Sequence, residues 1–214
     1  MRKQPKFGIL IAAALIATAA PASASTINFE DLGVPVGTQI NPASGVGVTT
    51  GGFNYTPGPS NPSGFNDLHI TNAETFWSFN GTTIGGTHDD VVLTKVGGKA
   101  FSIASFDYAG FPGGEASFRV SGVRADSTTI FASFIPDGLV DGPGGVQDFE
   151  TFSLTGDWSN LVSVTWTLTG PGISGLFALD NIVVDTTVTV PEPGSLALVS
   201  LALMGVAAAI RRKV

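Results

Sequence analysis

The side chains that could carry out chemistry are few in this chain of 214 residues. It has two histidines and no cysteine, which excludes zinc–thiolate, iron–sulfur and cysteine-nucleophile chemistry. It also lacks a His-Glu-x-x-His pattern, a Gly-x-Ser-x-Gly elbow and a phosphate-binding loop. None of the common catalytic motifs is present, so we expect a protein that is not an enzyme.

Neither histidine stands in a local pattern that predicts a metal site. His69 stands between Leu68 and Ile70 on a predicted strand, so its side chain should face away from both and toward solvent. The run His88-Asp89-Asp90 carries metal-binding groups, but neighbours on an extended chain alternate faces and cannot all reach one ion. We therefore predict a hairpin loop there, after Gly85-Gly86.

The charged residues are distributed unevenly. Six of the ten Lys and Arg residues lie in the two terminal segments, whereas only one of the seventeen acids does. The part between is strongly acidic, repels nucleic acid and anionic lipid, and suits solubility outside the cell or cation binding. Two of the acids could act as a glycosidase pair. No spacing singles out such a pair, so a secreted polysaccharide-active hydrolase is the alternative function.

The elements that must position these side chains read as strands, because residues 25–185 are rich in Gly, Thr, Ser, Val and Phe and lack helix-forming runs. Apolar alternation and turn residues predict strands near residues 26–29, 46–48, 53–55, 68–70, 75–79, 91–93, 100–108, 116–120, 128–134, 149–154, 162–168 and 176–184. In the strand 162–168, Val162, Val164, Trp166 and Leu168 should face inward. Within 100–108 the apolar residues move from odd-numbered to even-numbered positions, and such a shift fits a β-bulge. The pattern predicts an all-β ectodomain, a two-sheet antiparallel β-sandwich or jelly roll.

The start of the chain has the three parts of a signal peptide. Arg2, Lys3 and Lys6 form a positive region, and the apolar run Phe7–Ala20 follows it. Ala22 and Ala24 then make a small-residue cleavage site, with the cut expected after Ala24. We expect residues 1–24 to direct the chain to the Sec export machinery and signal peptidase; an uncleaved anchor helix is the alternative.

The end of the chain also has three parts, in residues 191–214 after a short linker at 186–190. The tripeptide Pro191-Glu192-Pro193 precedes the uncharged run Gly194–Ile210, and the basic cluster Arg211-Arg212-Lys213 follows. Those 17 apolar residues would span about 25 Å as a helix, which is the lower edge of what crosses a hydrocarbon core of about 30 Å. The three cations favour the cytoplasmic side. We predict a transmembrane helix held, at least transiently, in the inner membrane.

This tail closely resembles the PEP-CTERM sorting signal of Gram-negative bacteria, which has the same three parts in the same order. The resemblance implies processing by an exosortase, a membrane protease-transpeptidase that cuts near the Pro-Glu-Pro motif and releases or transfers the upstream protein. It also implies a membrane-anchored precursor whose mature form reaches the cell surface or the extracellular exopolysaccharide. A plain membrane anchor with an incidental Pro-Glu-Pro spacer is the alternative.

The two ends of the ectodomain carry a second resemblance. Ile27–Leu32 and Phe177–Ile182 look like the first and last strands of jelly rolls of the carbohydrate-binding-module type. In several such modules these strands lie side by side, and their acidic residues hold a structural Ca²⁺. The resemblance implies Glu30, Asp31 and Asp180 as ligands of a Ca²⁺ ion, with backbone carbonyls completing the shell. The alternative is that Glu30 and Asp31 begin a solvated turn while Asp180 caps nearby backbone groups.

One tryptophan is a candidate sugar contact. Trp158 lies in the predicted loop Thr155–Asn160, and exposed aromatic rings can stack on sugars; packing as a core residue or loop anchor is the alternative. Taken together, the sequence predicts an exported surface or matrix protein that is not an enzyme. Its domain either binds glycans or serves as a spacer.

Overall fold

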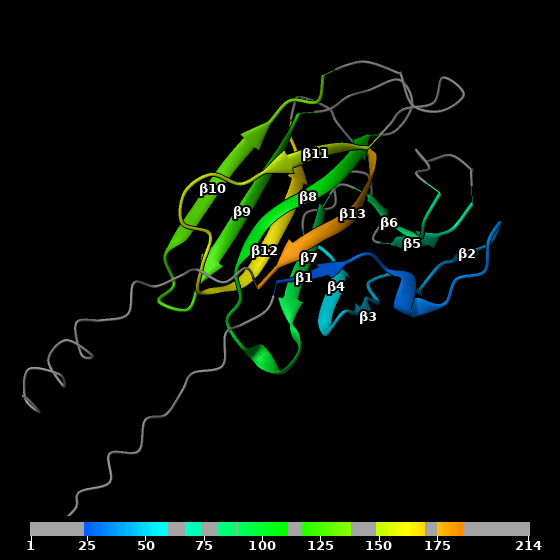
Figure 1. The fold of residues 1–214 in the computed structure, drawn as a ribbon, viewed down its shortest axis with the longest axis horizontal. Helices are drawn as coiled ribbons and strands as arrows, with labels where there is room; N and C mark the ends of the chain where they lie inside the picture. The colour runs from blue at the N-terminus through cyan, green and yellow to red at the C-terminus, as the bar shows by residue number, and fades with distance from the viewer. Residues whose placement is uncertain are drawn as a thin grey trace, which may run out of the picture.

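The computed structural model describes residues 24–59, 67–73, 81–88, 90–110, 117–137, 149–169 and 175–185 (Figure 1). The predicted signal-peptide helix, the strand at 75–79, the linker and the sorting signal, with Pro191-Glu192-Pro193 and Arg211-Arg212-Lys213, lie outside these residues. The elements are β1 (Ser25–Ile27), the 3₁₀ turn η1 (Glu30–Leu32), β2 (Gln39–Ile40), β3 (Val48–Thr50), β4 (Phe53–Pro57), β5 (Leu68–Thr71), β6 (Ile84–His88), β7 (Asp90–Lys95), the 3₁₀ turn η2 (Val96–Gly98), β8 (Ile103–Gly110), β9 (Phe118–Arg124), β10 (Thr129–Phe134), β11 (Glu150–Ser153), β12 (Leu161–Leu168) and β13 (Leu176–Val184).

The described strands form two antiparallel sheets. Sheet A has the order β11-β8-β13-β6-β5-β2, with β1 also paired to β13, and sheet B has the order β10-β9-β12-β7-β4-β3. In Figure 1, β8 and β13 of sheet A overlie β9 and β12 of sheet B. The prediction of an all-β, two-sheet antiparallel sandwich is confirmed.

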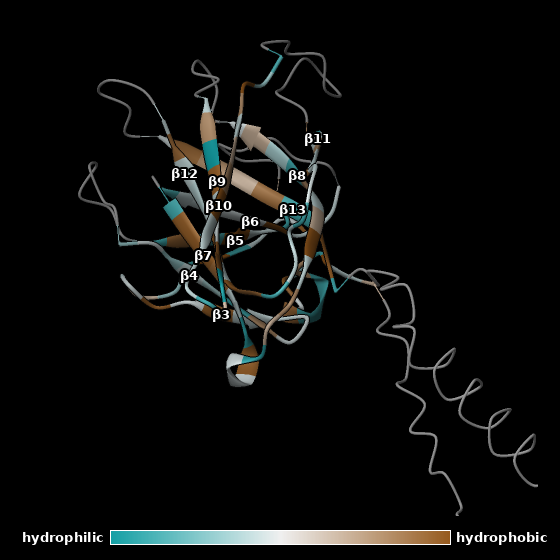
Figure 2. Cartoon of the chain, turned by 90° about the vertical axis from the view of Figure 1, so that its left-hand side faces the viewer, coloured by the Kyte–Doolittle hydropathy of each residue, from teal (hydrophilic) through white to brown (hydrophobic). Residues whose placement is uncertain are grey.

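The core lies between the sheets and combines aromatic with aliphatic side chains. Hydrophobic and hydrophilic residues succeed one another along the strands (Figure 2). On β12, Val164 and Trp166 are fully buried as predicted. Leu161 takes the buried place expected for Val162, because the pairing of β12 with β9 shifts register between Leu161 and Ser163. Rings from both sheets meet in the core, among them Phe106 against Trp166 at 5.5 Å between centroids.

Strand β6 corrects one prediction. Residues 84–88 were expected to contain a turn after Gly85-Gly86, but they form a strand paired with both β5 and β13. Glycine is needed here because the Phe29 ring packs against the backbone. A Cβ atom on Gly85 would lie 2.6 Å from Phe29 Cζ. The Tyr55 hydroxyl also donates to the Gly85 carbonyl at 3.0 Å. Gly85 therefore allows a ring to pack closely against the strand, and it does not form a turn.

The first and last strands of the domain lie side by side. β1 pairs with the C-terminal part of β13, with Ser25 opposite Val184 and Ile27 opposite Ile182. The register between β13 and β8 shifts twice: between Asp180 and Val183 the extra residue lies on β13, and between Val183 and Val184 it lies on β8, because Val183 and Val184 pair with Ser105 and Ile103. The extra residue on β8 is the bulge that the parity change predicted. None of the helices in the described part of the chain is long and apolar enough to cross a membrane.

Candidate functional site

The carboxylate of Asp31 is directed toward the β3–β4 turn. It accepts hydrogen bonds from the Thr50 hydroxyl at 2.5 Å and from the Gly51 amide at 2.8 Å. These contacts connect η1 to the turn between β3 and β4, and they hold the carboxylate in a polar environment.

Glu30 and Asp180 meet a different segment, the residues just before β6. Glu30 accepts from the Thr83 amide at 2.7 Å and from the Thr83 hydroxyl at 3.2 Å, and Asp180 accepts from the Thr82 hydroxyl at 2.9 Å. The structure thus brings Glu30 and Asp180 to adjacent threonines and turns Asp31 elsewhere. Among the described residues, these three acids do not form a group with all ligand atoms within 4.8 Å of one another. The Ca²⁺ assignment stays a prediction.

The position of Trp158 corrects the expected sugar contact. The residue lies in a loop as predicted, but its side chain is only 4% exposed and belongs to the core. Its ring packs near Gly122, where an added Cβ atom would lie 3.2 Å from Trp158 Cζ3. A surface pocket of about 360 Å³ borders this loop, with Asp157, Trp158 and Ser159 in its wall. Trp158 anchors the loop and does not present a free ring face.

A cluster that the sequence analysis did not predict joins Asp67, His69 and His88. His88 Nδ1 lies 2.5 Å from Asp67 Oδ1, and His69 Nε2 lies 3.4 Å from Asp67 Oδ2. The two imidazole rings are 5.5 Å apart between centroids. All three side chains are half-buried. His69 faces away from Leu68 and Ile70 toward the outer face of the sheet, as expected, but neighbouring side chains leave it only 17% exposed.

Two amide side chains also contact His69. Gln39 Nε2 lies 2.8 Å and Asn41 Oδ1 lies 2.9 Å from His69 Nδ1, and the two amides also contact each other. Burial lowers the pKa of His69, and the charge of a protonated His88 lowers it further, while the Asp67 carboxylate raises it. The net direction is downward, which favours a neutral imidazole at neutral pH. A neutral imidazole can accept a proton or bind a metal ion.

The outer face of sheet B carries an exposed aromatic ring. Phe131 on β10 is 67% exposed, and the Arg119 guanidinium lies 5.3 Å from its ring centroid. The cross-strand row continues from Phe131 to Ser121 and then to Thr165. An apolar ring beside hydroxyl and guanidinium donors can contact both the C–H face and the hydroxyl groups of a sugar.

The signals for these features were weak in the sequence. Asp67 and His69 are two residues apart and therefore share a strand face, which the sequence shows. His88 joins them only because β5 and β6 pair with Leu68 opposite Thr87. A turn after Gly85-Gly86, as predicted, does not allow that pairing. Phe131 sits between Ile130 and Ala132, and its own parity places it on the outer face.

Comparison with known proteins identifies the tail and gives the ectodomain distant structural neighbours. Residues 189–213 match the family described as the PEP-CTERM protein-sorting motif. No curated protein matches the chain. Among solved structures, a mutant family 29 carbohydrate-binding module is 12% identical, with a TM-score of 0.38 over 70% of this chain and 92% of that chain.

Two further structures are similar in outline. The family 11 carbohydrate-binding module of the cellulosomal cellulase Lic26A-Cel5E of Clostridium thermocellum is 13% identical, with a TM-score of 0.34 over 77% of this chain and 95% of that chain. The enzymatically active domain of tailspike protein 4 of bacteriophage CBA120 is 11% identical, with a TM-score of 0.27 over 69% of this chain and 19% of that chain.

Proposed function

We propose that this protein is exported and then sorted to the cell surface or extracellular matrix by an exosortase acting on its C-terminal signal. The observation that carries the proposal is the PEP-CTERM match at residues 189–213. The order of its parts is physically consistent with that role. An apolar run followed by Arg and Lys holds the tail in the membrane with its end inside the cell, which leaves Pro191-Glu192-Pro193 near the outer surface for cleavage.

The intact mass of the protein isolated from its native host tests the sorting proposal. We expect a chain that begins at Ser25 and ends near Pro191–Pro193, with any added mass on that end reporting transfer to a glycan or lipid. Replacing Pro191-Glu192-Pro193 by three alanines should leave the tail uncut, whereas replacing Thr186 and Thr187 by alanine should not. A native chain that still ends at Val214 would show a simple membrane anchor and contradict the proposal.

The sandwich itself acts, in this proposal, as a non-enzymatic domain that binds glycans through the outer face of sheet B. Exposed Phe131 is the observation that supports this surface. An aromatic side chain of this size that is left in water is available to stack on a sugar ring, and Arg119, Ser121 and Thr165 supply hydrogen-bonding groups around it.

Binding to host exopolysaccharide tests this surface. Phe131→Ala should weaken binding several-fold, in line with about 0.5–1.5 kcal/mol for a ring contact. Ile135→Ala is the matched control, because Ile135 is 77% exposed and lies just beyond the same strand, and it should leave binding unchanged. Equal binding by the Phe131→Ala variant and the native protein would remove this surface from the proposal. Progressive shortening of the polysaccharide by the native protein would instead establish the hydrolase alternative.

A further inference from the structure

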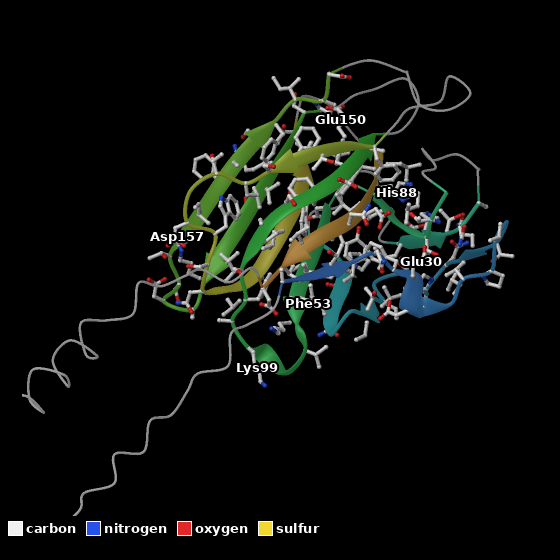
Figure 3. The ribbon with its side chains drawn as sticks, in the orientation of Figure 1. Glu30, Phe53, His88, Lys99, Glu150 and Asp157 are labelled. Atoms are coloured by element: carbon white, nitrogen blue, oxygen red, sulfur yellow. The ribbon has the colours of Figure 1, made fainter. Side chains whose placement is uncertain are left out.

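Three ligand-type side chains converge on the outer face of sheet A, away from sheet B. Asp67 precedes β5, His69 lies on β5 and His88 ends β6; Figure 3 shows His88 on the same side of the molecule as Glu30 and far from Asp157. One ligand atom from each of Asp67, His69 and His88 lies within 4.8 Å of the other two, and no other described His or acidic residues form such a group of three. The convergence brings together both histidines of the whole chain.

Strand geometry explains why the three side chains meet. Asp67 and His69 are two residues apart on an extended segment, so they project from the same face. β5 and β6 are antiparallel with Leu68 opposite Thr87 and His69 opposite Gly86. Continuing that register by one residue places Asp67 opposite His88. The arrangement is thus held by backbone pairing of two strands, which is a rigid support for a ligand site.

The residues beyond the cluster orient its ligands. Gln39 and Asn41 flank Nδ1 of His69, so Nε2 is the nitrogen that faces Asp67. When Nε2 binds a metal ion, Nδ1 carries a proton, and Asn41 Oδ1 is placed at 2.9 Å to accept it. Such a hydrogen bond to the second ring nitrogen is the usual support of a metal-binding histidine.

We propose that Asp67, His69 and His88 form a binding site for a divalent transition-metal ion, best matched by Zn²⁺. Two imidazole nitrogens and one carboxylate oxygen suit Zn²⁺ and its neighbours in the first transition row, whereas Ca²⁺ and Mg²⁺ take oxygen ligands. Donor atoms of a tetrahedral zinc site lie about 3.3 Å apart, close to the 3.4 Å between His69 Nε2 and Asp67 Oδ2. The 2.5 Å between His88 Nδ1 and Asp67 Oδ1 is a hydrogen-bond distance and would have to lengthen when the ion binds. The ion would displace the proton shared by His88 and Asp67, and a water molecule would fill the fourth position.

Calorimetric titration of the full chain tests the proposal, using protein in detergent and without a histidine tag. Zn²⁺ should bind with a stoichiometry of one, while Ca²⁺ and Mg²⁺ should not compete at equal concentration. His88→Gln, His69→Gln and Asp67→Asn should each weaken Zn²⁺ binding at least tenfold, and Asn41→Ala about tenfold. Asp157→Asn, which changes an exposed acid far from the cluster (Figure 3), should leave the affinity unchanged.

X-ray absorption by the zinc-loaded native protein gives a second measurement that does not depend on any variant folding. The expected shell has two imidazole ligands, which can only be His69 and His88 because the chain has no other histidine. A shell of oxygen atoms alone, an affinity unaltered by His88→Gln, or no saturable binding of Zn²⁺ would overturn the proposal. The cluster would then be a hydrogen-bonded ion pair only.

Discussion

Tyr55 connects the two sheets through one hydrogen bond. It is fully buried on β4 of sheet B, and its hydroxyl donates to the carbonyl of Gly85 on β6 of sheet A. Phe29 packs edge-on against it with 5.0 Å between ring centroids. Gly85 therefore serves two neighbours at once, since its missing side chain admits Phe29 and its carbonyl accepts from Tyr55.

The stability at high pH should depend on Tyr55. Burial raises the pKa of Tyr55 far above its ordinary value of 10.0. As pH rises past about 10, the unfolded chain loses this proton first, so the free energy of unfolding falls from that pH upward. Tyr55→Phe should lower stability at pH 8 by about 1–3 kcal/mol, because the Gly85 carbonyl loses its donor. Between pH 8 and pH 11 the free energy of unfolding should also fall less for this variant than for the native protein.

Urea unfolding of both proteins at the two pH values measures this difference. The comparison between variants cancels the titration of lysines, which both proteins share. An equal loss of stability in the two proteins would show that Tyr55 is not the group that titrates.

The burial of single residues could be predicted from the sequence where alternation along their own strand determines it. Val164 and Trp166 are buried because strand alternation fixes their face. The His69–His88 contact was missed because it needs the pairing of two strands, and no local pattern gives a register. For Trp158 the sequence left a sugar contact and a loop anchor both open, and the fold decides for the anchor because the ring packs near Gly122 on β9.

At the scale of elements, the terminal strand β1 is short but strongly constrained. It has three residues and one partner, β13. Ile27 is buried in the core, whereas Thr26 is exposed. β1 is therefore held by the burial of one apolar side chain as well as by its hydrogen bonds to β13. The cleavage expected after Ala24 would leave β1 at the start of the mature chain.

Substitutions in β1 should separate these two contributions. Ile27→Ala should lower the free energy of unfolding by about 2–5 kcal/mol, because it opens a cavity beside the core. Thr26→Ala keeps the backbone pairing and removes only an exposed side chain, so it should cost under about 0.5 kcal/mol. Thermal or urea unfolding gives both values. A small effect of Ile27→Ala would mean that β1 detaches without disturbing the core.

Most strands could be predicted from apolar alternation and turn residues, and β13 was predicted with its observed bounds, Leu176–Val184. β6 was not predicted, since Gly-Gly is a turn signal in isolation and its role here depends on Phe29, which lies far away in the sequence. The side-by-side placement of β1 and β13 came from the resemblance of the two ends to carbohydrate-binding modules. It could not have come from propensity, because pairing between distant strands is not encoded locally.

At the scale of the whole molecule, the predicted Ca²⁺ would tie the start of the domain to its end. Glu30 and Asp180 already meet adjacent threonines, and Asp31 follows Glu30 directly. We expect EDTA to lower the melting temperature and added Ca²⁺ to restore it, because an ion bound only by the folded state stabilises that state. Asp180→Asn should abolish the response to Ca²⁺, and Asp126→Asn should preserve it.

The two proposed ions can be told apart in one experiment. In a His88→Gln background, the response to Ca²⁺ should persist while the response to Zn²⁺ is lost. A melting temperature that changes with neither EDTA nor Ca²⁺ would contradict the calcium prediction, and it would leave the roles of Glu30 and Asp31 as anchors of the turns around η1.

The position of β13 has a mechanical consequence. The chain leaves the sandwich at Asp185, whose amide donates to Ser102 at 2.9 Å and whose carboxylate pairs with Lys95. β13 is bonded to β8 on one side and to β6 and β1 on the other. A pull on the tail thus runs along the strand and loads many hydrogen bonds at once in shear, rather than opening them one after another. A domain tethered by its C-terminal end would therefore resist tension through this strand, and it could transmit force between the cell and a ligand bound on its outer faces.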